Sequence, residues 1–332
     1  MRVLLIGSKR LNNLEEFASN AFERLGHQVR FLGYSEFLTV RPSVWALGAT
    51  RLFGPLFNFG AALVLRRFQS AILDAASQSD PDLILVFKGE GVAPSTVSRL
   101  RRRSSSPVAL WYPDDPRFFS TFVRWIAPGY DLVFTYLTRG LERYRSLGLP
   151  RVYCVPFGCD PSIHNIRSET PDGSKGPDVV FVGTYTRRRA RMIHALQRAG
   201  FRPDIYGRYW NHKTSDKQPP VYGEAMARLY SNAKITLNFH TVPGWGPNMR
   251  VFEATGSGAF LLTDDCDDIG RYYLRGKELE VFHDMKDLCA KVRYFVAHDE
   301  DRGEIARAGY QRTQREHTYD ARMKAILSHL DS

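Results

Sequence analysis

The sequence has little cysteine, and the cysteines it has are scattered. The four residues Cys154, Cys159, Cys266 and Cys289 form no CxxC pair. A disulfide framework or a structural zinc site usually shows closely spaced pairs, so neither is expected here. We expect reduced thiols, as in a cytoplasmic protein.

No uninterrupted apolar run is long enough to cross a membrane. The most apolar region, residues 44–65, is broken by Arg51, Pro55 and several glycines, and Arg66 and Arg67 follow it. This pattern disfavours a spanning helix and favours a buried or domain-facing one. A helix on a membrane surface stays open. No signal-peptide pattern is present, so we expect a cytoplasmic protein, with peripheral contact at the inner membrane surface as an alternative.

Several well-known site motifs are missing. The loop at residues 7–10, which follows the first apolar run, is not GxGxxG, so the dinucleotide fingerprint is absent there. HExxH, EF-hand, Walker A and GxSxG patterns are also absent. Their absence removes the usual signatures of zinc proteases, calcium sites, P-loops and α/β-hydrolases. We therefore predict no metal site and no resident cofactor.

Acidic residues are too few to balance the basic ones. The chain has 46 Lys and Arg against 35 Asp and Glu, which gives a net charge of +11. The excess leans toward residues 1–160. It favours phosphates, anionic lipid or nucleic acid as partners without choosing among them. A solvated basic face is the plain alternative.

The chain does contain a repeated order of strand and helix. Residues 2–7 form an apolar run closed by glycine, residues 14–25 have helical spacing, and residues 27–32 supply a second strand. Strands buried in parallel sheets form such runs, with helices as the crossovers. Further strands are predicted at 83–87, 108–111, 131–135 and 152–155, and then at 178–182, 204–206, 235–240, 259–262 and 279–282.

Residues 161–177 separate the two series. Polar residues, proline and glycine dominate there and apolar residues nearly vanish, which is typical of a linker. The sequence therefore predicts an α/β protein with a Rossmann-like N-terminal domain over 1–160 and a Rossmann-like C-terminal domain over 178–317. The last helix, about 318–332, is expected to cross back to the N-terminal domain.

The stretch from Gly246 to Thr263 is the most informative part of the chain. A glycine and proline turn carries Asn248 and Arg250, a helical piece carries Glu253, and an apolar strand follows. In open parallel sheets, ligands bind beyond the carboxyl ends of the strands. The three polar side chains are therefore predicted to lie at a ligand site.

Five short segments together resemble one family. They are Val-Phe-Val-Gly-Thr-Tyr at 180–185, Ile-Tyr-Gly-Arg-Tyr-Trp at 205–210, Asn-Met-Arg-Val-Phe-Glu at 248–253, Phe-Lys-Gly at 87–89 and Trp-Tyr-Pro-Asp-Asp-Pro at 111–116. In this order and spacing they are similar to the CgeB-like (spore-maturation-protein-like) glycosyltransferases. The resemblance covers most of the chain and implies the GT-B fold, in which two Rossmann-like domains face a cleft.

The resemblance also implies a function. Enzymes of this kind move a sugar from a nucleotide sugar, here a UDP-, GDP- or dTDP-sugar, to an acceptor, generally without a metal. The C-terminal domain would bind the donor, with Glu253 on the ribose hydroxyls and with Arg250 and Asn248 at the diphosphate. The wider donor site would include Gly183, Thr184, Tyr185, Arg187, Tyr206 and Gly207.

Some of these residues have plainer explanations. Arginines 187–189 open a helix against its dipole, which a bound phosphate would explain, although only one or two need touch it. The aromatic residues at 206–210 either stack on a nucleobase or cap the core. Trp245 stands eight residues before Glu253, where a second glutamate is familiar in retaining enzymes. The stereochemical outcome therefore stays open.

The N-terminal domain supplies candidates for acceptor binding. Lys88 and Gly89 follow one predicted strand, and Asp114 and Asp115 follow the next, so they are expected to face the cleft. Adjacent carboxylates raise one another's pKa, which makes Asp115, with Asp114 second, the nominated base for the acceptor. Asp-Asp-Pro is also good turn chemistry. His240, at a strand end, is a further candidate base.

Two other classes of function stay open. The arginines at 101–103 and 187–191 would suit a nucleic-acid-binding protein, or a glycosyltransferase that acts on DNA. A catalytically inactive GT-B scaffold that binds a nucleotide sugar or a partner protein is the second. The acceptor (glycan, lipid, protein, nucleic acid or small molecule) and the oligomeric state are not specified.

Overall fold

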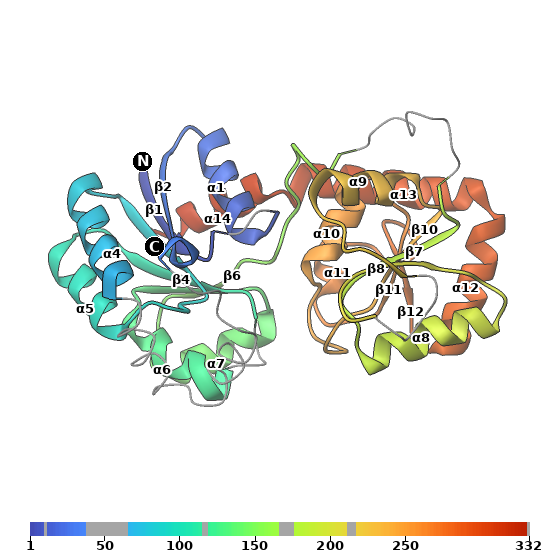
Figure 1. The fold of residues 1–332 in the computed structure, drawn as a ribbon, viewed down its shortest axis with the longest axis horizontal. Coiled ribbons are helices and arrows are strands. Elements are labelled where there is room, and N and C mark those ends of the chain that lie inside the picture. Colours follow the sequence, from blue (N-terminus) through green and yellow to red (C-terminus); the bar gives the residue numbers. More distant parts are fainter. Residues whose placement is uncertain (10–11, 38–65, 115–118, 166–175, 211–216, 331–332) are drawn as a thin grey trace. The chain divides into compact units, whose positions relative to one another are not determined.

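The computed structural model describes residues 1–332 except 10–11, 38–65, 115–118, 166–175, 211–216 and 331–332. The chain divides into two compact units (Figure 1). Unit 1 is Met1–Pro156 together with Arg322–Ser332, and unit 2 is Phe157–Ala321. Each unit contains one parallel sheet with helices on its faces.

Unit 1 is built on a six-stranded sheet in the order β2-β1-β3-β4-β5-β6, with every neighbouring pair parallel. The central strands are apolar and fully buried, as expected of strands with helices on both sides. The strand order reverses between β1 and β3, which is where such sheets bind ligands. The strands are β1 (Arg2–Gly7), β2 (Gln28–Gly33), β3 (Leu83–Phe87), β4 (Val108–Tyr112), β5 (Leu132–Thr135) and β6 (Val152–Cys154).

Four helices of unit 1 lie on the same face of its sheet. Phe68, Leu100, Ile126 and Tyr144, from α4, α5, α6 and α7, join one core with that face of the strands. The outer sides of these helices are therefore turned away from the sheet. The helices are α1 (Leu14–Arg24), α4 (Arg66–Ser79), α5 (Pro94–Arg103), α6 (Arg124–Ile126) and α7 (Leu141–Arg145), with short turns η1 (Tyr34–Glu36), η2 (Phe119–Val123), η3 (Ala127–Gly129) and η4 (Thr138–Gly140).

Unit 2 has a second six-stranded parallel sheet, in the order β12-β11-β10-β7-β8-β9. The chain runs from β7 to β8 and β9, then returns past β7 to β10. The strand order therefore reverses between β7 and β10. The strands are β7 (Val179–Val182), β8 (Asp204–Tyr206), β9 (Lys217–Gln218), β10 (Ile235–Asn238), β11 (Leu261–Asp264) and β12 (Glu280–Phe282).

Helices cover both faces of the second sheet. Ile193 of α8 and Val292 of α12 belong to one core, whereas Tyr230 of α9 and Phe252 of α10 belong to the other. Helix α14 begins in unit 2 and ends in unit 1. The helices are α8 (Arg187–Arg198), α9 (Gly223–Asn232), α10 (Met249–Gly256), α11 (Ile269–Tyr272), α12 (Met285–Ala297), α13 (Asp299–Glu316) and α14 (Tyr319–Ser328).

The predicted fold class is confirmed, because both halves are parallel sheets flanked by helices. The boundary between the units differs from the prediction. The chain passes from unit 1 to unit 2 after Pro156, before the linker predicted at 161–177, whose residues 166–175 lie outside the described part. Backbone bonds explain the difference. The Cys159 N–H donates to His317 O at 2.9 Å, and the Tyr319 N–H donates to Cys159 O at 2.8 Å.

The chain returns to unit 1 at Arg322, not at residue 318. Residues 317–319 are bonded to Cys159 within unit 2, so only the later part of α14 belongs to unit 1. The helix considered for 44–65 lies outside the described residues. No helix in the described part of the chain is both long and apolar enough to cross a membrane.

Candidate functional site

The predicted donor residues gather where the strand order of unit 2 reverses. Gly183 follows β7, and Asn238 ends the neighbouring β10. Helix α8 begins at Arg187, shortly after β7. Thr186 caps it, because Thr186 Oγ1 accepts the Arg189 N–H at 3.2 Å. The next loop along the sheet leads into α10 at Asn248. Two helix N-termini therefore begin at the carboxyl edge of the sheet.

Arg189 is buried in this edge and ties three segments together. Its Nε and Nη2 donate to Phe239 O at 2.9 and 2.7 Å, and its Nη1 donates to Thr184 O at 2.9 Å. Burial lowers the pKa of Arg189 to about 10, with repulsion from the nearby Arg250 as the next cause. Because its donors are engaged by the protein, Arg189 holds the loop after β10 in place.

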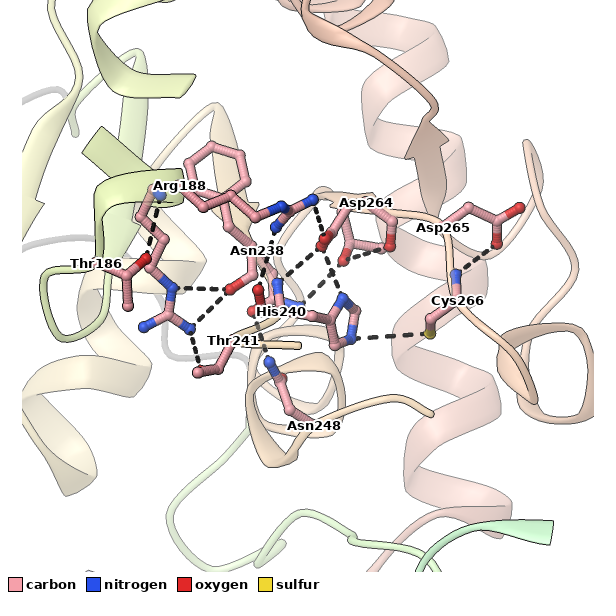
Figure 2. A network of polar contacts seen from close by, with 12 residues as sticks. Thr186, Arg188, Asn238, His240, Thr241, Asn248, Asp264, Asp265 and Cys266 are labelled. Atoms are coloured by element: carbon pink, nitrogen blue, oxygen red, sulfur yellow. Dashed lines mark hydrogen bonds and ion pairs between the residues drawn. The ribbon is translucent and has the colours of Figure 1, made fainter. Parts of the chain in front are cut away.

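Arg188 and Asp264 form an ion pair beside it. Arg188 Nη2 lies 2.8 Å from Asp264 Oδ2, and Arg188 Nη1 donates to His240 O at 3.1 Å (Figure 2). Burial disfavours the Asp264 carboxylate, but bonds from His240 and the charge of Arg188 outweigh it, so the pKa of Asp264 is lowered. Arg187, the site residue predicted in this helix, is exposed, unlike Arg188. Asp264, which ends the buried strand β11, was not among the predicted site residues.

His240 is buried and both of its ring nitrogens contact protein groups, so its nomination as a base stays a prediction. Its Nδ1 lies 2.7 Å from Asp264 Oδ1, and its Nε2 lies 3.8 Å from Cys266 Sγ (Figure 2). The residue is only 3% exposed. Burial and nearby aspartates raise the pKa of Cys266, so the thiol stays protonated. A base must reach the hydroxyl that it activates, and both ring nitrogens of His240 face the protein.

Asn248 is held by a chain of side-chain bonds. Its Nδ2 donates to Asn238 Oδ1 at 3.1 Å, and Asn238 Nδ2 donates to Thr263 Oγ1 at 3.0 Å (Figure 2). Asn248 precedes α10, but its side chain does not cap that helix. The first amides of α10 therefore lack a side-chain cap from this residue, which suits them to an anion. This arrangement is compatible with the predicted place of Asn248 at the diphosphate.

Arg250 and Glu253 lie one turn apart near the start of α10. Arg250 Nε donates to Val182 O at 2.7 Å, and its Nη1 lies 3.5 Å from Glu253 Oε2. Burial opposes the Arg250 charge, but Tyr230 and Glu253 outweigh it and raise the pKa of Arg250. The side chain is partly exposed, whereas Glu253 is 1% exposed. Arg250 is thus anchored at the end of β7 with its charge retained.

His164 is a neighbour of Glu253 that the sequence did not reveal. Its Nε2 lies 3.9 Å from Glu253 Oε1, and its Nδ1 accepts the Asp160 N–H at 3.1 Å. Burial lowers the pKa of His164 despite the attraction of Glu253 and Asp160. The neutral ring therefore carries its proton on Nε2, facing the glutamate. His164 falls in the segment predicted as linker, where no pattern distinguishes it.

The two predicted glycines allow a close approach between loops. A Cβ on Gly207, whose φ is +156°, would lie 2.1 Å from Gly183 O. Trp210 Nε1 donates to the same carbonyl at 2.8 Å. Trp210 is a core residue, which decides against it as a nucleobase platform. Tyr206 is half-buried, and Tyr209 is exposed.

Tyr185 and Thr184 lie in the loop between β7 and α8. Tyr185 packs edge-on against Trp210, with ring centroids 5.3 Å apart, and its N–H donates to Arg208 O at 3.0 Å. Thr184 is exposed, and its carbonyl oxygen accepts a hydrogen bond from Arg189. The loops after β7 and β8 are therefore joined, which places both segments of the predicted donor site side by side.

The acceptor candidates of unit 1 lie where its own strand order reverses. Lys88 Nζ donates to Asp114 Oδ2 at 2.6 Å, and Asp115 lies outside the described residues. Burial opposes the Lys88 charge, but Asp114, Glu90 and Glu15 raise the pKa of Lys88. Asp114 therefore has a lysine partner, and its predicted interaction with Asp115 stays a prediction because Asp115 lies outside the described residues. This ion pair makes Asp114 a weaker candidate base.

Two further features mark this edge of unit 1. Gly89 has φ +70°, and a Cβ there would lie 2.5 Å from Ile126 Cδ1, so the turn after β3 requires glycine. Glu15 Oε2 accepts the Ser8 and Lys9 N–H groups at 2.7 and 2.9 Å. These amides, after β1, are where such folds receive phosphate. A carboxylate of the protein itself occupies them, which sequence reasoning missed.

The described residues contain no group of three or more His, Cys, Asp or Glu side chains placed to hold a metal ion. The charge available at the edge of unit 2 is instead supplied by arginine. Arg188 and Arg189 are engaged with the protein, and Arg250 is anchored with part of its side chain exposed. This arrangement can bind an anion through the guanidinium of Arg250 and the neighbouring backbone amides at the start of the helix.

Known proteins were compared with this sequence and fold. The family described as "Glycosyl transferase-like" matches residues 187–328. Among curated proteins, spore protein CgeB of Bacillus subtilis is 24% identical over 272 residues, which cover 74% of this chain and 83% of CgeB.

Solved structures with the same fold are far more distant in sequence. Sucrose-phosphate synthase from Thermosynechococcus elongatus aligns with a TM-score of 0.70 at 12% identity, covering 99% of this chain and 98% of that one. Anabaena HepE, solved in complex with UDP-glucose, aligns with a TM-score of 0.68 at 12% identity, covering 100% and 99%. At these identities the likeness establishes the fold alone.

Proposed function

We infer that this chain transfers a sugar, because it is a CgeB-like protein of the GT-B glycosyltransferase fold. We further propose that the donor is a nucleotide sugar bound by unit 2. HepE, with the same fold, is solved with UDP-glucose. A UDP-, GDP- or dTDP-sugar would serve as co-substrate in this chain.

One observation carries the assignment to unit 2. Arg250 is anchored to Val182 O at 2.7 Å, so it stands at the reversal of strand order with its charge retained. The N-terminus of α10 lies beside it without a side-chain cap from Asn248. A diphosphate placed there would receive a guanidinium and backbone amides together.

The proposed chemistry follows from this placement. An acceptor hydroxyl attacks the anomeric carbon, and the bond from that carbon to the diphosphate breaks. The nucleoside diphosphate leaves with an added negative charge, which Arg250 and the amides of α10 stabilise. We propose that this cationic support replaces a metal ion. Glu253, between Arg250 and His164, would accept hydrogen bonds from the ribose hydroxyls. Tyr206 and Gly207 would border the nucleoside.

We propose that unit 1 binds the acceptor near Lys88 and Gly89, with Asp115 as the base. The carboxylates of Glu15, Glu90 and Asp114 all raise the pKa of Lys88, so the surroundings of this lysine are acidic. Such surroundings suit a neutral hydroxyl acceptor better than a phosphorylated one. A cytoplasmic location, with peripheral contact at the inner membrane surface, stays a prediction.

Donor binding tests the proposal directly. We expect one of the nucleotide sugars to raise the melting temperature of the wild-type protein. Arg250→Ala and Glu253→Ala should each weaken binding of that donor by about 10- to 100-fold, the range for a lost charge-assisted bond. Arg271→Ala, an exposed arginine on α11, removes the same charge as a control and should bind normally. If both site variants bind like the wild type, the site assignment is wrong.

A further inference from the structure

Unit 1 carries a strongly basic surface that the proposed reaction does not use. We call the outer sides of α4, α5, α6 and α7 the basic helix layer. Within the bounds of these helices the chain has nine arginines, no lysine and two carboxylates, Asp74 and Glu142. The whole chain has a net charge of +11. The basic excess is therefore concentrated on one face of one sheet. The arginines are Arg66, Arg67, Arg99, Arg101, Arg102, Arg103, Arg124, Arg143 and Arg145, all exposed.

Few of these charges are needed for the fold. Arg101 Nε lies 2.7 Å from Asp131 Oδ1, and Arg145 Nη1 lies 2.8 Å from Glu142 Oε1. Three arginines at the end of α5 complement the helix dipole, but that effect is small and is satisfied within one turn. A cluster of like charges costs free energy through mutual repulsion. An anionic partner would remove that cost.

Two hollows flank α5. One, of about 640 Å³, is lined by Arg101, Arg102 and Arg151 together with serines and with Asp131, the partner of Arg101. The other, of about 350 Å³, lies between α4 and α5 and is lined by three arginines, Arg66, Arg99 and Arg103, and one carboxylate, Asp74. A guanidinium binds a phosphate oxygen pair through two parallel bonds, which an ammonium does not, and the layer uses arginine alone. Each hollow thus offers several guanidinium groups to a phosphate headgroup.

The exposed Trp125 favours a membrane over other polyanions as the partner of the basic helix layer. Its side chain is 58% exposed, and the Arg124 guanidinium lies 4.8 Å from its ring centroid. Among the described residues, Trp125 is the only exposed large apolar side chain on these helices. Single-stranded nucleic acid is usually held by several aromatic side chains along a groove, whereas tryptophan beside arginine suits the lipid–water interface.

We propose that the basic helix layer docks this protein on a membrane surface rich in anionic phospholipid. The arginines contact the phosphate headgroups, and Trp125 enters the interface. The attraction is electrostatic in its larger part, so it weakens as salt rises. This inference stands apart from the donor site, because its residues all belong to unit 1 and none has been assigned to sugar transfer.

Vesicle flotation with the full-length protein tests the proposal. We expect binding to phosphatidylcholine vesicles that contain phosphatidylglycerol, little binding to phosphatidylcholine alone, and loss of binding between about 50 mM and 500 mM NaCl. The triple variant Arg99→Gln, Arg102→Gln, Arg103→Gln should bind about 100-fold more weakly, since each surface cation contributes about fivefold. Trp125→Ser should weaken binding at 50 mM NaCl, where the wild type binds.

A matched control separates the surface from the net charge. Arg198→Gln, Arg202→Gln, Arg307→Gln removes three exposed arginines from unit 2 and should bind vesicles like the wild type. Equal losses in the two triple variants would contradict the proposal, as would a wild-type protein that ignores the anionic vesicles. A single- or double-stranded oligonucleotide that displaces the protein from vesicles at lower concentration than lipid would assign the layer to nucleic acid instead.

Discussion

Three consecutive arginines at the start of α8 have three different environments. Arg187 is exposed, Arg188 pairs with Asp264, and Arg189 is buried against carbonyl groups. Identical side chains thus differ because successive residues of a helix point about 100° apart. In the sequence the three arginines look alike as candidates for phosphate binding. In the structure one of them is exposed and the other two hold loops in place.

The buried ion pair makes stability depend on acidity. The pKa of Asp264 is lowered in the folded state, so its contribution is present above the ordinary aspartate pKa and is lost as pH falls through the folded value. We expect the unfolding free energy of the wild type to fall from about pH 5 downward, and Asp264→Asn to show a shallower fall. Near pH 7 this variant should lose about 3 kcal/mol. Urea unfolding across pH measures both effects.

The neighbouring aspartate provides the comparison. Asp265 pairs with the exposed Arg275 at 2.8 Å, so its ion pair is screened by solvent. Asp265→Asn should therefore leave both the stability near neutral pH and its slope almost unchanged. Equal slopes for the wild type and Asp264→Asn would refute the role assigned to the buried pair.

The side chain of Arg189 joins helix α8 to the loop after β10. Arg189 spans from the first turn of α8 to Phe239 O and Thr241 Oγ1. The loop after β10 leads toward Asn248 and Arg250, so the position of the candidate donor residues depends on this anchor. An element-level contact of this kind joins segments about 50 residues apart and leaves no local pattern in the sequence.

Replacing the anchor should damage both stability and donor binding. Arg189→Met leaves Phe239 O and Thr184 O without their donor, so we expect a loss of about 2–4 kcal/mol in the unfolding free energy. Arg187→Ala, two residues earlier, should change it by less than about 0.5 kcal/mol. Chemical denaturation and nucleotide-sugar titration measure the two effects. Similar stability of the two variants would contradict the anchoring role.

The whole molecule consists of two units with separate cores. Unit 1 includes the end of α14, and unit 2 contains every residue assigned to the donor. Proteins with two cores often unfold in more than one step, and a ligand stabilises the part that binds it. The charge is also unequally distributed, with the basic helix layer in unit 1.

Calorimetry should therefore show a ligand effect on one part of the unfolding profile. We expect a nucleotide sugar near 100 times its Kd to stabilise unit 2 by about 2.7 kcal/mol and to raise the transition of that unit. The transition of unit 1 should stay in place. Arg250→Ala, which binds the donor about 10- to 100-fold more weakly, should reduce this stabilisation to about 0.4–1.4 kcal/mol without removing either transition. A uniform shift of a single transition would indicate that the two units unfold as one.

Much of the fold and part of the site could be predicted from residues alone. Short apolar runs separated by helical spacing indicated two parallel sheets, and 248–253 indicated a group of polar residues at a strand end. These patterns are local, because burial on both faces of a strand leaves a continuous apolar run. The short strand β9, at Lys217–Gln218, was not predicted because it is polar and forms no apolar run.

The sequence by itself determined the two-sheet architecture, the family resemblance and the positions of Arg250 and Glu253, since each depends on neighbouring residues. Only the tertiary structure decided that Arg188 and Arg189 anchor loops, that His240 is buried against Asp264, and that His164 faces Glu253. It also gathered nine arginines from four helices into the basic helix layer. Such pairings join residues far apart in the chain, and they follow from packing, which no local pattern records.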